Sequence, residues 1–213
     1  MKITKFIHSC LLIEMPAPVN RTALFDPGMM SEGTLPVDKL EYIDDIIITH
    51  GHPDHMHVPL IQKLLAKFPD VRITAPADAV EELKKAGITA QSTPSEGIAF
   101  FDAPHEETYP LFPRPDEIGV HYLDKLSDPG DSHSFNETKA VLALPVQAPW
   151  GSSVDAVNLA LKLKPQYVIP IHDWHWSDDA RATMYDRLEQ ILKEQGNITF
   201  CKMETGVPVV LDV

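Results

Sequence analysis

The feature that constrains this chain most is a group of histidines placed directly after a short apolar strand. Residues 46–48 are three consecutive isoleucines between polar neighbours, a pattern typical of a strand that is buried on both faces. The segment that follows is Thr49-His50-Gly51-His52-Pro53-Asp54-His55, with His57 two residues later. The whole chain has only 10 histidines in 213 residues, so four within eight positions is a strong local bias. We therefore expect a strand end that presents imidazoles and a carboxylate, and not a solvated polar loop.

The spacing of these side chains suits metal binding. His50 and His52 are two residues apart, so they lie on one side of an extended backbone. Pro53 fixes the turn before Asp54 and His55. Imidazole and carboxylate groups are suitable ligands for zinc, iron or manganese. The two histidines can therefore bind one ion, and the Asp-His pair can bind a second ion beside it.

Three further ligand candidates recur in the same local context in the second half of the chain. His105 and His172 each follow the end of a predicted strand, and Asp131 follows Gly130 in a predicted turn. Asp128 lies three residues earlier and competes with Asp131 for the same role. Taken one at a time, residues in such positions are more often structural than functional. Their shared placement at strand ends and turns makes them candidates for the same site.

The rest of the chain alternates between strand and helix patterns. Apolar spacing, with caps at Ser152 (with Asp155) and Ser177, predicts helices over residues 58–68, 77–86, 154–163 and 178–194. Short runs of alternating or β-branched residues predict strands over 1–14, 22–26, 44–49, 71–75, 98–103, 119–124, 139–146, 167–171, 199–202 and 207–211. The stretch 106–116 has three prolines and no period, which predicts a loop. We expect one domain over residues 1–213, with two sheets and helices packed outside them.

Charge and cysteine content narrow the class of partner. The formal net charge is −13, and the 18 Lys and Arg residues are scattered, which argues against nucleic acid. Cys10 and Cys201 lie in apolar stretches, which predicts buried free thiols and favours a reducing, cytoplasmic setting. No signal-peptide pattern and no apolar run of about 18 residues is present, so no membrane is expected. A small-molecule substrate is the expected partner, and a homo-oligomer stays open.

The order of the candidate ligands resembles a known family. The motif His50-x-His52-x-Asp54-His55, followed at a distance by His105, Asp131 and His172, is similar to the metallo-β-lactamase superfamily in order and in motif. The first strands of that fold resemble His8-Ser9-Cys10-Leu11-Leu12-Ile13-Glu14 and Leu24-Phe25-Asp26-Pro27-Gly28. Segments 156–165 and 168–172 resemble the branch of ascorbate-6-phosphate lactonase-like proteins. The resemblance spans nearly the whole chain and implies an α/β fold, an αββα four-layer sandwich with the metals at one edge.

The resemblance also implies a ligand set. One ion takes His50, His52 and His105, and the other takes Asp54, His55 and His172, with Asp131 bridging both. Each ion then has three or four nitrogen and oxygen ligands and room for solvent. Two divalent cations are expected, with Zn²⁺ first and Mn²⁺ or Fe as alternatives.

Some segments depart from the family pattern or have no assigned role. The third-ligand segment is Ala103-Pro104-His105-Glu106-Glu107, and it lacks the Thr-Pro-Gly-His run of the glyoxalase II-like and sulfur dioxygenase-like members. Those substrate classes are therefore less expected. The histidines that fit no ligand position are His57, His121, His133 and His175. The roles of His133, His175, Trp150, Trp174 and Trp176 stay open.

The expected chemistry is hydrolysis. Two cations can hold a hydroxide that attacks a carbonyl carbon, and the same cations stabilise the oxyanion that forms. Asp54 is expected as a ligand that also orients the water or moves a proton. The expected substrate is a small ester, lactone or amide. A metal-dependent phosphodiesterase would use the same ligands and is the alternative. Arg114 in the long loop is a weak indication of an anionic substrate. A metal-binding protein with no useful turnover is the third hypothesis.

Overall fold

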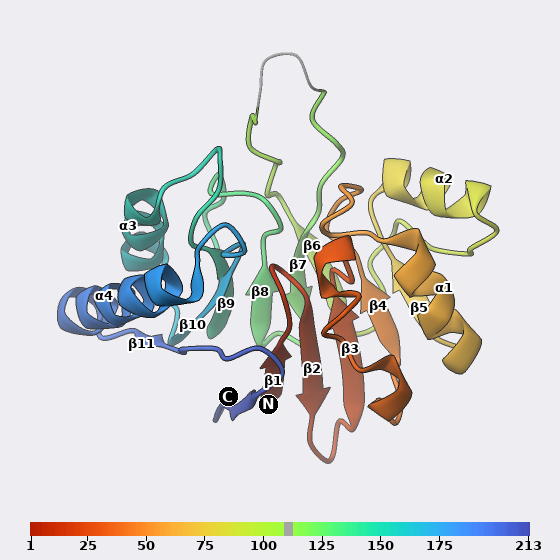
Figure 1. The fold of residues 1–213 in the computed structure, drawn as a ribbon, viewed down its shortest axis with the longest axis horizontal. Helices are drawn as coiled ribbons and strands as arrows, with labels where there is room; N and C mark the ends of the chain where they lie inside the picture. Colours follow the sequence, from red (N-terminus) through yellow and green to blue (C-terminus); the bar gives the residue numbers. More distant parts are fainter. Residues whose placement is uncertain (109–112) are drawn as a thin grey trace. The chain divides into compact units, whose positions relative to one another are not determined.

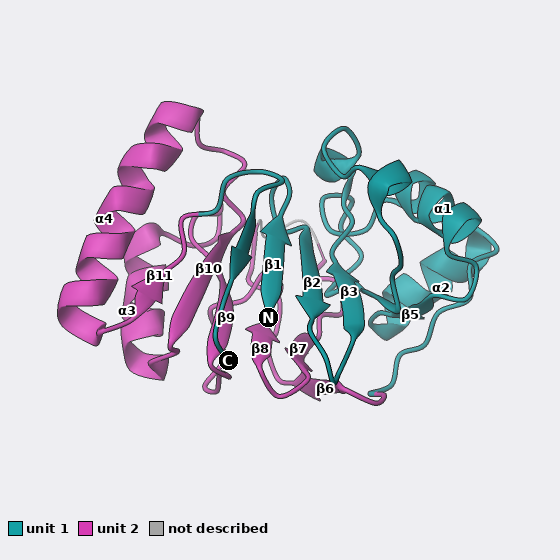
Figure 2. Ribbon diagram, turned by 90° about the horizontal axis from the view of Figure 1, so that it is seen from below, with its two compact units in different colours: residues 1–94, 203–213 teal, residues 95–202 magenta. Residues whose placement is uncertain are grey.

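The computed structural model describes residues 1–108 and 113–213, and its contacts divide the chain into two units. Unit 1 consists of residues 1–94 and 203–213, and unit 2 consists of residues 95–202 (Figure 2). Within these described residues, each unit has one six-stranded sheet and two α-helices. These are the strand and helix layers that the predicted α/β class requires. The prediction of one domain over residues 1–213 stays a prediction.

The sheet of unit 1 is mixed (Figure 1). Its strands, in spatial order, are β12 (Pro208–Val210), β1 (Lys2–Lys5), β2 (Leu11–Met15), β3 (Arg21–Phe25), β4 (Asp45–Ile47) and β5 (Arg72–Thr74). The pairs from β12 to β3 are antiparallel, and β3, β4 and β5 are parallel. Its helices are α1 (Val58–Lys67) and α2 (Ala77–Lys85), with short 3-10 helices at Met29–Ser31 and Val37–Lys39.

The core of unit 1 forms between α1 and one face of this sheet. Leu60, Ile61 and Leu64 of α1 are fully buried in the same cluster as Ile46 and Ile48. Burying one such side chain contributes about 1.5–3 kcal/mol. The side chain of Ile47 points to the opposite face of the sheet from those of Ile46 and Ile48, and it is also 0% exposed. This confirms the prediction of a strand buried on both faces.

The sheet of unit 2 carries the second pair of helices. Its strands, in spatial order, are β11 (Thr199–Phe200), β10 (Tyr167–Ile171), β9 (Val141–Pro145), β8 (Leu126–Asp128), β7 (Gly119–Tyr122) and β6 (Ile98–Phe101). Its helices are α3 (Ser153–Leu163) and α4 (Asp178–Gly196). The predicted caps are confirmed: Ser152 and Asp155 form a capping box on α3, and Ser177 caps α4 by accepting from the N–H of Ala180.

Strand direction decides which loops meet at one edge of each sheet. In unit 1, Leu11 at the start of β2 pairs with Phe25 at the end of β3, which pairs with Ile47 at the end of β4. The β1–β2 turn and the segments after β3 and β4 therefore share one edge. In unit 2, β8, β9 and β10 are parallel, and β6 runs the same way because β7 is antiparallel to both β6 and β8. The segments after these four strands share one edge of that sheet.

The structure corrects some of the sequence-based predictions. The strand predicted over 1–14 is two strands, because the chain reverses at a turn in which Phe6 N–H donates to Cys10 C=O at 2.8 Å. Strand β8 was not predicted, since three residues are too few to show a period. The described part of the predicted loop 106–116 contains no helix or strand, and residues 109–112 lie outside the described residues. The other predicted elements are present, and their ends shift by a few residues.

Two smaller predictions concern cysteines and membranes. Cys10 and Cys201 are free and buried, as predicted. Burial raises the pKa of the Cys10 thiol to about 12, so that side chain stays a neutral thiol. Among the residues described, none of the helices combines the length and the apolar run that crossing a bilayer demands.

Candidate metal centre

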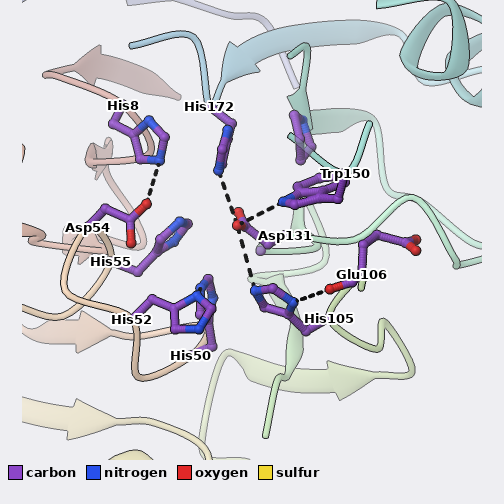
Figure 3. Close-up of polar contacts among 12 residues, drawn as sticks. His8, His50, His52, Asp54, His55, His105, Glu106, Asp131, Trp150 and His172 are labelled. Carbon is purple, nitrogen blue, oxygen red and sulfur yellow. Dashed lines mark hydrogen bonds and ion pairs between the residues drawn. The ribbon is translucent and has the colours of Figure 1, made fainter. Parts of the chain in front are cut away.

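The four ligand candidates of unit 1 lie in the turn that follows β4 (Figure 3). The N–H groups of His55 and Met56 both donate to the carbonyl of His52, at 3.0 and 2.8 Å, which closes a tight turn. The segment after β3 holds this turn in place, because Met29 N–H donates to Pro53 C=O at 2.8 Å and His57 N–H donates to Pro27 C=O at 3.1 Å. The turn that carries the histidines is therefore fixed by hydrogen bonds within itself and by hydrogen bonds to the segment after β3.

A buried carboxylate, Asp26, determines which nitrogen of two histidines is available for a ligand. Its Oδ2 lies 2.7 Å from His55 Nδ1, and because a carboxylate only accepts, that nitrogen is the donor. The Thr49 hydroxyl donates its single hydrogen to the same Oδ2 at 2.7 Å. The Thr49 oxygen must therefore accept from His50 Nδ1, which lies 3.2 Å away. In the neutral rings of His50 and His55, the lone pair is then on Nε2.

His50 and His52 present two nitrogens at a separation that fits one ion. His50 Nε2 lies 3.1 Å from His52 Nδ1. Two ligands about 2.0–2.1 Å from one tetrahedral ion are roughly 3.3 Å apart. His50 is 0% exposed, while His52 is partly exposed. This pair is the part of the sequence prediction that the geometry of unit 1 supports most directly.

Sequence reasoning missed His8 as a residue of this group. His8 lies in the β1–β2 turn, is 1% exposed, and has its Nε2 3.2 Å from Asp54 Oδ2. One ligand atom from each of His8, Asp54 and His55 lies within 4.8 Å of the other two. Its backbone is left-handed, with φ 64°, a conformation that histidine adopts more readily than most residues. A single histidine in a predicted strand does not indicate a metal site. Only the register of β2 against β3 brings His8 close to Asp54.

The three ligand candidates of unit 2 also lie together (Figure 3). Asp131 Oδ2 is 3.1 Å from His172 Nε2 and 3.7 Å from His105 Nε2. The opposite nitrogens face carbonyl oxygens: His172 Nδ1 lies 2.8 Å from Gln147 C=O, and His105 Nδ1 lies 2.6 Å from Glu106 C=O. Because a carbonyl only accepts, both Nδ1 atoms donate, and both neutral rings carry the lone pair on the Nε2 that faces Asp131.

The structure distinguishes Asp131 from its competitor Asp128. The Oδ1 atom of Asp128 accepts from Gly130 N–H at 3.0 Å, so this carboxylate stabilises the turn. The backbone of Asp131 is anchored by a hydrogen bond, because its N–H donates to Glu117 Oε2 at 3.0 Å. Of the two, Asp131 is the one whose carboxylate oxygen lies between His105 and His172.

The other histidines singled out by the sequence lie elsewhere. His57 contacts Glu32 at 3.2 Å, and His121 contacts the Ser127 hydroxyl at 2.9 Å in the sheet of unit 2. His133 Nε2 donates to Pro145 C=O at 2.8 Å, and burial lowers the pKa of this imidazole below its usual value. The ring of His175 stacks on that of His172 with centroids 6.0 Å apart. None of these contacts gives the residue a ligand position.

The donor set in each unit fits divalent metal ions. The groups that converge are imidazoles and carboxylates, and no thiolate is among them. This set suits zinc, manganese or iron. The four residues of unit 1 and the three residues of unit 2 form two groups, and their combination into one centre of seven ligands stays a prediction.

Comparison with known proteins identifies relatives of the whole chain. The family described as "beta-lactamase superfamily domain" matches residues 2–172. Protein Rv0786c of Mycobacterium tuberculosis is 31% identical over 94% of this chain and 100% of its own length.

Two solved structures have the same fold at low sequence identity. Igni18, a metallo hydrolase from Ignicoccus hospitalis, aligns with a TM-score of 0.73 and 20% identity over 100% of this chain and 98% of its own. The metallo-β-lactamase fold protein YhfI from Bacillus subtilis aligns with a TM-score of 0.65 and 17% identity over 98% of each chain. The likeness confirms the predicted α/β fold class.

Proposed function

Since this chain belongs to the metallo-β-lactamase superfamily, we propose that it is a metal-dependent hydrolase that cleaves a small ester, lactone or amide. One observation carries the metal-dependent part of the proposal. Asp26, directly and through Thr49, sets the tautomers of His55 and His50 so that both present Nε2 as a ligand atom. A histidine whose second nitrogen donates to a carboxylate is the common arrangement in metal sites. The name of the solved metallo hydrolase from Ignicoccus hospitalis supports the same activity class.

The proposed centre uses the seven predicted ligands. His50, His52 and His105 would hold one divalent ion, Asp54, His55 and His172 the second, and Asp131 both. When bound, such a pair of cations polarises the scissile carbonyl and lowers the pKa of a bound water. Zn²⁺ is the first expectation, with Mn²⁺ or Fe as alternatives, because imidazole and carboxylate ligands accept all three.

Asp54 is the residue proposed to act on the attacking water. Its side chain is 28% exposed, so solvent reaches the carboxylate, and His8 Nε2 lies 3.2 Å from Oδ2. A carboxylate in this position can accept a hydrogen bond from water and take up its proton. The water oxygen would bond to the carbonyl carbon of an ester while the bond to the alkoxy oxygen breaks. The proton would leave with the alcohol, and the other product would be the acid.

Charge favours a small neutral substrate over a phosphodiester. The net charge of −13 disfavours a polyanion. Arg114, the cation in the long loop, pairs with Glu107 at 3.3 Å, so its charge is already compensated. No specific contact in the described residues therefore supports the phosphodiesterase alternative.

Metal analysis followed by a substrate panel tests the proposal. Protein purified without chelator is expected to contain close to two equivalents of transition metal, and the His50→Ala variant to contain less. The His57→Ala variant is the matched control, because His57 contacts Glu32 at the surface and holds no ligand position. The panel would contain lactones, esters, amides and phosphodiesters, assayed with Zn²⁺ or Mn²⁺. Turnover of phosphodiesters alone would show that the substrate is a phosphodiester and not a small ester, lactone or amide. Bound metal without turnover would favour the hypothesis of a metal-binding protein with no useful turnover.

A further inference from the structure

Trp150 lies on a rigid turn beside the ligand candidates of unit 2. The turn connects β9 to α3, and Ala148 and Gly151 exchange backbone hydrogen bonds across it, at 3.0 and 3.3 Å. The next residue, Ser152, is the N-cap of α3 and belongs to its capping box. The backbone that carries Trp150 is therefore held between a strand and a capped helix.

Neighbouring rings hold the indole on two sides. His133 lies 5.1 Å away, centroid to centroid, at an interplanar angle of 77°, and is anchored by its hydrogen bond to Pro145 C=O. His133 packs so closely against the turn that a Cβ at Gly151 would come within 3.0 Å of its ring. The His172 ring lies 5.5 Å from the indole at an angle of 66°. These edge-to-face contacts fix the direction of the indole N–H.

That N–H points at the carboxylate of Asp131. Trp150 Nε1 donates to Asp131 Oδ2 at 3.3 Å (Figure 3). The same oxygen lies 3.1 Å from His172 Nε2 and 3.7 Å from His105 Nε2. An indole nitrogen only donates and a carboxylate only accepts, so the direction of this bond is unambiguous. Trp150 therefore contacts the oxygen on which the two histidines converge.

We propose that Trp150 is a positioning residue of the metal centre, which orients the Asp131 carboxylate through its indole N–H and reports metal binding in its fluorescence. This inference rests on the proposed function, because it assigns Asp131 as a metal ligand. The indole occupies one lone-pair direction of Oδ2 and restrains rotation of the carboxylate. Residues that hydrogen-bond to a metal ligand without binding the metal themselves typically contribute about 10–100-fold to metal affinity. This contact assigns a role to Trp150, whose role the sequence left open.

The first test measures Zn²⁺ affinity in two phenylalanine variants. Trp150→Phe keeps an aromatic ring but removes the N–H, and we expect its Zn²⁺ dissociation constant to rise about 10-fold or more. Trp174→Phe is the matched control, because Trp174 is 48% exposed on the loop after His172, and its affinity should equal that of the wild type. Equal affinities in all three proteins would overturn the inference and leave the proposed function intact. Absence of Zn²⁺, Mn²⁺ and Fe binding by the wild type would overturn both.

The second test is spectroscopic and does not require Trp150 to be removed. The chain has three tryptophans, so the double variant Trp174→Phe/Trp176→Phe keeps Trp150 alone. Titration with Zn²⁺ should change its fluorescence and saturate at the stoichiometry found by metal analysis. Bound Zn²⁺ with no fluorescence change would overturn the inference, even if Trp150→Phe failed to fold.

Discussion

Oδ2 of Asp26 lies 2.7 Å from Nδ1 of His55, and both side chains are 0% exposed. The contact joins a residue at the end of β3 to one in the turn after β4. A carboxylate here does more than neutralise charge, because it also accepts from the N–H and the hydroxyl of Thr49. One buried side chain therefore orients two of the predicted ligands, His55 directly and His50 through Thr49.

Replacing Asp26 is expected to weaken metal binding without changing any ligand. In Asp26→Asn the charge is lost, and the amide can turn a donor toward His55 Nδ1, which then favours the wrong tautomer. We expect Zn²⁺ affinity to fall about 10–100-fold, as measured by competition with a chromophoric chelator. Asp44→Asn, an exposed change in the same unit, should retain the wild-type affinity. Unchanged affinity in Asp26→Asn would show that the tautomers are set by other groups.

Gly28 is expected to tolerate no side chain. A Cβ at this position would lie 1.6 Å from the carbonyl oxygen of Asp54 and 2.1 Å from its carbonyl carbon. These are backbone atoms, so the turn that carries Asp54 would have to move. We expect Gly28→Ala to lower the free energy of unfolding by about 3 kcal/mol in urea titrations.

Gly33→Ala is the matched control for this substitution. A Cβ at Gly33 meets no atom within 4 Å, and the variant should unfold at the wild-type urea concentration. If the two alanine variants were equally stable, the close approach at Gly28 would not constrain the turn.

His8 is expected to contribute to metal retention although the sequence motif does not include it. In His8→Asn the side chain is too short to keep the 3.2 Å contact with Asp54, while asparagine tolerates the left-handed backbone. We expect the variant to bind Zn²⁺ about 10-fold more weakly by calorimetry. His57→Asn, whose contact is with Glu32, should bind as the wild type does. If His8→Asn bound Zn²⁺ as tightly as His57→Asn, His8 would have no part in metal binding, and the site would consist of the predicted ligands alone.

His121 is expected to make stability depend on pH. Burial is the largest cause that lowers the pKa of this imidazole below its usual 6.5, against the opposing contact with Glu137. As the pH falls through 6.5, the unfolded chain takes up a proton that the folded chain does not, so the free energy of unfolding decreases. His121→Asn cannot titrate, and it should lose less stability than the wild type between pH 7.5 and 5.5 in urea titrations. Parallel losses in the two proteins would assign the pH dependence to other groups.

Local sequence patterns predicted the elements and the main motif of this protein. The isoleucine run of β4 is buried on both faces, and the capping box at Ser152 starts α3. The succession from His50 to His55 after a buried strand indicated metal ligands, and the family assignment is confirmed by the match over residues 2–172. Patterns of this kind are readable because helix caps, strand burial and turn residues depend on neighbours a few positions away.

Contacts between segments that are distant in the sequence were decided only by the tertiary structure. His8 contacts Asp54, and Asp26 contacts His55, because β2, β3 and β4 pair in one register, which places a turn and two strand ends at the same edge. Trp150 meets Asp131 because β8 and β9 run parallel. The sequence alone determined which residues have ligand chemistry and which strands precede them. The tertiary structure decided which partners orient those residues, because a hydrogen bond depends on strand register and side-chain direction across the fold, which no local pattern encodes.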